Sequence, residues 1–123
     1  MKMRNVGMLL AVAAFALLPF VSAAADKAAD TTVKGELVDM ACYMSHDGQG
    51  ADHADCAVKC VKGGQPMGLK AADGKLYVLF ADHGDSAAFT KAKDLAGKNV
   101  EITGQVATKD GVSGITVRGV KAL

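Results

Sequence analysis

The chain has no tryptophan, and only two tyrosines and four phenylalanines occur in 123 residues. Its core must therefore be built mainly from valine, isoleucine, leucine and alanine. The sequence also has no phosphate-binding glycine loop, no hydrolase nucleophile motif and no CxxCH for covalent haem c. These absences argue against nucleotide binding, serine hydrolysis and c-type haem, and no motif identifies an enzyme.

A long apolar run occurs only near the N-terminus. Lys2 and Arg4 precede an almost wholly apolar segment, 8–21, and small residues follow at Val21-Ser22-Ala23. This three-part pattern is typical of a secretory signal peptide. We therefore predict a signal peptide over 1–23, export to the periplasm or the cell exterior, and no membrane span after cleavage.

The predicted mature chain has no excess of positive charge. Cleavage after Ala23, or alternatively after Ala25, removes Lys2 and Arg4 from the 14 basic residues and leaves 12 against 13 acidic ones, a net charge of −1. Nucleic acid is thus a disfavoured partner. We expect a flexible lead-in over 24–31 and one domain over 32–123, a length that suffices for a single small core.

Alternating apolar residues and turn signals predict mostly β structure. The expected strands are 32–43, which bends where its apolar phase changes at Leu37-Val38, then 67–70, 75–80, and two more around the Asp110-Gly111 turn. A turn-rich loop is expected over 45–49. Two short helices are expected over 51–62 and from 85 or 86 to 96, each followed by glycine.

This order of elements predicts a mainly β fold. Five strands with a helix between the third and the fourth match the OB-fold, a five-stranded antiparallel Greek-key barrel, here with a helix inserted after the first strand. Glycines within the predicted strands suit the bends of a small barrel. An open antiparallel sheet with one helix packed on it is the alternative.

The inserted helix carries the residues best suited to chemistry. His53, Cys56 and Cys60 are spaced i, i+3 and i+7, which places them on one stripe of a helix. Cys42, at the end of the predicted first strand, is close enough in sequence to fold against that stripe. Three thiolates and one imidazole suit tetrahedral zinc. Met44 or His46 could add a further ligand, and the thioether of Met44 would favour copper.

Two further hypotheses compete with the metal site. In an oxidising compartment Cys42 could form a disulfide with Cys56 or Cys60, worth about 3 kcal/mol in the chain-entropy estimate, and leave one thiol free. The protein would then be a disulfide-stapled module that binds a periplasmic protein. A thiol-redox protein is the third hypothesis. The disulfide leaves His53 and one cysteine without a role, so the sequence favours binding of zinc or copper over enzymatic activity.

Several segments resemble a group of small exported bacterial proteins with an OB-fold-like ending and largely uncharacterised function. The matching stretches are Gly35 to Tyr43, His53 to Cys60, Gly63-Gly64-Gln65-Pro66, Gly74 to Tyr77 and Leu95 to Gly104. The resemblance covers most of the predicted mature chain. It implies the same fold and draws attention to Cys42, His53, Cys56 and Cys60, but it implies no activity.

Overall fold

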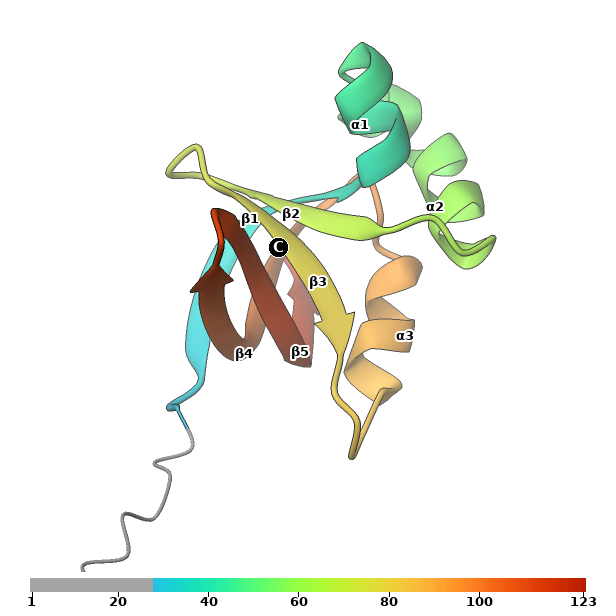
Figure 1. Cartoon of the computed structure of the whole chain (residues 1–123). Helices are drawn as coiled ribbons and strands as arrows, with labels where there is room; N and C mark the ends of the chain where they lie inside the picture. Colours follow the sequence, from blue (N-terminus) through green and yellow to red (C-terminus); the bar gives the residue numbers. More distant parts are fainter. Residues whose placement is uncertain (1–27) are drawn as a thin grey trace, which may run out of the picture.

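The computed structural model describes residues 28–123, so the signal peptide predicted over 1–23 lies outside the described residues. The domain is mainly β, with five strands and three short α-helices (Figure 1). The strands are β1 (Thr31–Asp39), β2 (Met67–Ala71), β3 (Leu76–Ala81), β4 (Asn99–Lys109) and β5 (Val112–Ala122). The helices are α1 (Met40–His46), the 3-10 turn η1 (Ala51–His53), α2 (Ala54–Lys62) and α3 (Ala87–Lys93).

The five strands close into a barrel in the order β1-β2-β3-β5-β4, and β4 pairs back onto β1. This excludes the open sheet and agrees with an OB-fold-like architecture. The sheet is mixed, however, because β3 and β5 run parallel from Val78↔Gly114 to Ala81↔Val117. An all-antiparallel barrel was therefore a wrong prediction. In a closed ring, directions can alternate throughout only if the number of strands is even, so five strands require a parallel neighbour.

The alternation predicted for the fourth strand is confirmed. Val100, Ile102 and Gly104 are buried in β4, and the intervening residues are more exposed. Gly104 lies at a register shift between β4 and β5, where an added Cβ would lie 2.0 Å from the Thr116 carbonyl oxygen. Glycine is thus required for the close approach of the two backbones, and the bulge helps to curve the barrel wall.

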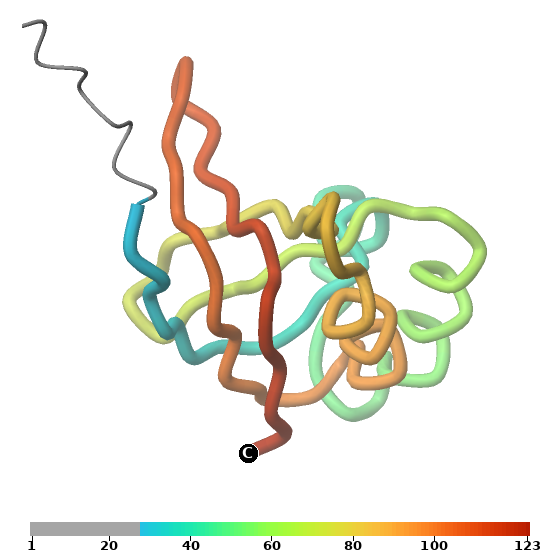
Figure 2. Tube along the Cα trace, turned by 90° about the horizontal axis from the view of Figure 1, so that it is seen from below, coloured from blue at the N-terminus to red at the C-terminus, as the bar shows by residue number. Residues whose placement is uncertain are grey.

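The β4–β5 hairpin is long, and its tip extends beyond the barrel (Figure 2). Its turn has positive φ at Asp110 (50°) and Gly111 (83°), as the predicted Asp-Gly turn requires. The β2–β3 turn is also where the sequence predicted it, with Gly74 at φ 86° and the Asp73 carboxylate accepting a hydrogen bond from the Lys75 amide at 2.9 Å.

The first strand ends at Asp39, four residues earlier than predicted, and the chain enters α1 directly. Asp39 caps this helix, because its Oδ1 atom accepts a hydrogen bond from the Ala41 amide at 3.0 Å. The change of apolar phase at Leu37-Val38 therefore precedes a change from strand to helix and not a bend within a longer strand. Helix α1 also replaces part of the loop expected over 45–49.

Helices α1 and α2 lie at one end of the barrel, and α3 lies along the side where β3 leads to β4 (Figure 1). The predicted inserted helix is confirmed, with its first turn as η1. Helix α3 ends at Lys93, earlier than the predicted Ala96. The following Gly97, at φ 80°, lies against Ala54, where a Cβ would approach the Ala54 Cα to 2.5 Å. Helix α2 thus packs against the segment that leads into β4.

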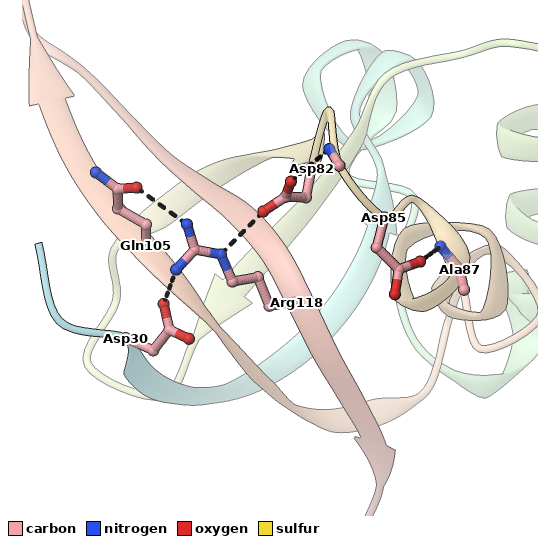
Figure 3. Close-up of polar contacts among 7 residues, drawn as sticks. Asp30, Asp82, Asp85, Ala87, Gln105 and Arg118 are labelled. Carbon is pink, nitrogen blue, oxygen red and sulfur yellow. Dashed lines mark hydrogen bonds and ion pairs between the residues drawn. The ribbon is translucent and has the colours of Figure 1, made fainter. Parts of the chain in front are cut away.

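A polar network joins the start of β1 to the barrel wall (Figure 3). The Arg118 side chain donates hydrogen bonds to Asp82 at 2.9 Å and to Asp30, and it also contacts Gln105. Asp82 additionally accepts a hydrogen bond from the Gly84 amide at 2.8 Å. These contacts fix the loop after β3, which leads to α3.

Within residues 28–123, no helix combines the length and apolarity needed to cross a membrane.

Candidate metal centre

The four residues that the sequence singled out lie on neighbouring elements at one end of the barrel. Cys42 is on α1 and not at the end of a strand as predicted, His53 is the last residue of η1, and Cys56 and Cys60 are on α2. The 3-10 turn joins directly to α2, so His53 and the two cysteines are carried by nearly continuous helical backbone.

The ligand atoms form two groups that share Cys42. In the first group, the Cys42 sulfur, a ring nitrogen of His53 and the Cys56 sulfur all lie within 4.8 Å of one another. In the second group, the Cys42 sulfur, the Cys60 sulfur and a carboxylate oxygen of Asp39 likewise all lie within 4.8 Å of one another. The predicted residues therefore meet around Cys42, but Cys60 and His53 occupy different groups.

The His53 side chain is free to bind a metal ion, because no hydrogen bond occupies its Nε2 atom. Its Nε2 atom is buried and has no hydrogen-bond partner. Buried polar atoms are nearly always paired, and leaving one unpaired costs about 1–3 kcal/mol. The His46 and His53 rings form a T-shaped pair, with a centroid distance of 5.6 Å and an interplanar angle of 81°.

Gly48 makes room for the His53 ring. An added Cβ would lie 2.8 Å from His53 Nε2, 3.0 Å from the Cys42 Cβ and 3.0 Å from the His46 Cε1. The Gly48 amide donates a hydrogen bond to the Cys42 carbonyl at 3.1 Å, which holds the loop against α1. A side chain at position 48 would therefore occupy the space beside the imidazole.

Two side chains from the barrel hold the rest of this loop. The Gly50 amide donates a hydrogen bond to the Glu36 carboxylate of β1, and the Lys70 ammonium of β2 donates one to Gln49. The Lys70 ammonium also lies 5.6 Å from the centre of the Tyr43 ring. The loop between α1 and η1 is thus tied to two strands, and it sets where His53 lies relative to Cys42.

Asp39 is the functional candidate that sequence reasoning missed. It is the fully buried polar residue of the described core, with 0% exposure. Its Oδ1 atom caps α1, whereas its Oδ2 atom is buried without a partner of hydrogen-bond geometry. An acidic residue directly before a helix is a capping signal, but the signal was hidden because the strand was expected to continue to Tyr43.

Two thiols of the cluster, Cys42 and Cys60, hold their protons tightly when no cation is present. The adjacent Asp39 carboxylate, which attracts the thiol proton, together with burial and the neighbouring Cys56 and Cys60, raises the pKa of Cys42 to about 12. Burial, Cys56 and Asp39 also raise the pKa of Cys60. Burial raises the pKa of Asp39 as well, but contacts with the two thiols and the Ala41 amide outweigh it and hold that pKa below its usual value. A cation must therefore displace thiol protons to bind here.

The remaining sequence candidates lie at the surface. Met44 is 71% exposed, and His46 is exposed although its ring contacts His53. His83 lies in an exposed loop after β3. Cys42, Cys56 and Cys60 are free thiols, so the disulfide considered as an alternative is not formed in this structure.

In comparisons with known proteins, the chain matches no family model, no curated protein and no solved structure.

Proposed function

We propose that this protein binds a transition-metal ion, zinc or copper, with Cys42, His53 and Cys56 as its ligands. The observation that carries the proposal is the convergence of two sulfurs and an imidazole nitrogen within 4.8 Å, with the His53 Nε2 buried and unpartnered. Thiolate and imidazole are the ligands that zinc and copper prefer in proteins.

The spacing of these atoms agrees with coordination to one ion. Tetrahedral zinc, with Zn–S of about 2.3 Å and Zn–N of about 2.0 Å, places ligand atoms about 3.5 to 3.8 Å apart. The separations of up to 4.8 Å need only a modest contraction to reach these values. Cys56 is exposed, so water can fill the fourth position from the solvent side. Cys60, the fourth ligand predicted from the sequence, lies with Asp39 instead.

The N-terminal sequence pattern supports a place of action outside the cytoplasm. Lys2, Arg4 and the apolar segment that follows are typical of an exported protein. We therefore place metal binding in the periplasm or the cell exterior. There the ion itself is the ligand of the site, and the exposed Cys56 side is where we expect a periplasmic protein partner to approach.

Metal stoichiometry of the purified, reduced protein tests the proposal. Wild type should bind Zn²⁺ or Cu⁺, and cobalt loading should give the intense charge-transfer band of Co–thiolate bonds. His53→Ala should lose affinity at least about tenfold, as expected for a lost ligand. His83→Ala, which removes an exposed histidine outside the cluster, should bind as wild type does. No uptake of metal by the fully reduced chain, or equal affinities of both histidine variants, would refute the assignment.

A further inference from the structure

The cluster contains more donors than one ion can use. Counting Cys42 itself, the cluster contains three sulfurs, one imidazole and one carboxylate, whereas zinc in proteins takes four ligands. The donors form two groups that share Cys42: His53 and Cys56 belong to the first, and Asp39 and Cys60 belong to the second. A single ion bound by Cys42, His53 and Cys56 leaves the second group without a cation.

Asp39 points to a ligand in this second group. The residue is completely buried, and helix capping uses only its Oδ1 atom. Oδ2 is buried without a partner of hydrogen-bond geometry, and the neighbouring groups that stabilise its negative charge are the Cys42 and Cys60 thiols. Such an arrangement is costly unless a cation or a donor compensates it. The Cys42 and Cys60 sulfurs are the neighbouring groups that could bind the same cation.

Charge balance favours two ions over one. With all three thiols ionised, the cluster carries three negative charges from sulfur and a fourth from Asp39. The described ion pairs occupy Lys34, Lys62 and Arg118, and none of them involves Asp39. One divalent ion bound by Cys42, His53 and Cys56 would balance two thiolates and leave the buried Asp39 carboxylate uncompensated, whereas a second divalent ion that displaces the Cys60 proton would leave the cluster neutral.

We propose that Asp39, Cys42 and Cys60 form a second metal site, in which the Cys42 thiolate bridges two Zn²⁺ ions. This inference rests on the proposed function, because the first ion is the one held by Cys42, His53 and Cys56. Each ion then has three protein ligands, one of them shared. The second ion binds through Asp39 Oδ2, while Oδ1 keeps its hydrogen bond to the Ala41 amide.

Zinc titration of the full, reduced chain followed by native mass spectrometry tests the second site. Wild type should bind two Zn²⁺ per chain, and Asp39→Asn should bind one. Asparagine is as good a helix cap as aspartate, so this variant removes the anionic ligand while it retains the cap of α1. Asp85→Asn is the matched control, because Asp85 also accepts a hydrogen bond from a helix amide two residues further along, that of Ala87 at 2.9 Å, but lies outside the cluster. It should bind two.

Cysteine variants test the bridge and keep the result independent of Asp39. Cys60→Ser should bind one Zn²⁺ per chain, and Cys42→Ser should lose both ions because it removes the shared ligand. In the cobalt-loaded protein, the second equivalent should weaken the electron paramagnetic resonance signal through coupling across the thiolate. Asp39→Asn should abolish that weakening.

The outcomes separate the two proposals. Wild type that binds a single Zn²⁺, which His53→Ala loses, would overturn the bridged site and leave the first site standing. Two ions in both wild type and Asp39→Asn would overturn the assignment of Asp39. Wild type that binds none would overturn both proposals.

Discussion

Replacing Gly48 by alanine should weaken metal binding without unfolding the protein. The new methyl group would lie 2.8 Å from His53 Nε2, and ordinary contacts begin near 3.4 Å, so the imidazole must retreat by about 0.6 Å. Metal–ligand distances tolerate changes of only about 0.2 Å. We expect the dissociation constant for Zn²⁺ to rise about 10- to 100-fold, which corresponds to about 1.4 to 2.8 kcal/mol.

The loop around Gly48 has little freedom to relieve this clash. Gly50 and Gln49 are tied to Glu36 and Lys70 of the barrel, so the imidazole is the group that must move. Zinc affinity would be measured by competition with a chromogenic chelator, and the melting temperature of the metal-free protein would be recorded alongside it.

The control for this substitution is Gly84→Ala. Its Cβ would meet its nearest neighbour, Asp82 Oδ1, at an ordinary 3.4 Å, and the site lies outside the cluster. Zinc affinity of Gly84→Ala should equal that of wild type. If Gly48→Ala also binds zinc within twofold of wild type, the reasoning that Gly48 sets the position of His53 is refuted.

Two further predictions concern the barrel. Arg118 holds the pKa of Asp82 below its usual value, so this pair stabilises the fold above the unfolded-state pKa of about 3.9 and loses its effect as the pH falls through the folded-state pKa. The difference in unfolding free energy between wild type and Asp82→Asn, from urea titrations, should shrink from pH 6 to pH 2; a constant difference contradicts this. In the same assay, Ile102→Ala, at 0% exposure, should lower the free energy of unfolding by about 2–5 kcal/mol. Val112→Ala, at 57% exposure, should lower it by less than about 1 kcal/mol. Equal losses in the two variants would contradict the placement of the core.

Local patterns predicted several elements well because their causes are local. The alternation in β4 reflects the two-residue period of a strand, and the Asp110-Gly111 turn reflects the positive φ that both central residues must adopt. The prediction for the first strand was too long because Met40 and Cys42 continue an apolar alternation. The Asp39 cap ends the strand, and its effect depends on the following residues becoming helical.

The parallel β3–β5 pair was implied by the number of strands, although the pattern of each strand contains no trace of it. Strand direction within a barrel is a property of the closed ring. It becomes visible only when the order of the strands is known, and neighbours far apart in sequence, such as β1 and β4, set that order.

The sequence by itself determined the chemical types of the donors and the arrangement of those on one helix. His53, Cys56 and Cys60 follow one another at helical spacing, and the period of the backbone fixes how they are presented. Only the tertiary structure decided which atoms meet. It placed Cys42 on a helix between two groups, set Cys60 beside Asp39 and left Gly48 against the imidazole. Periodicity specifies directions within one element, whereas distances between elements depend on how the barrel, its caps and its loops pack together.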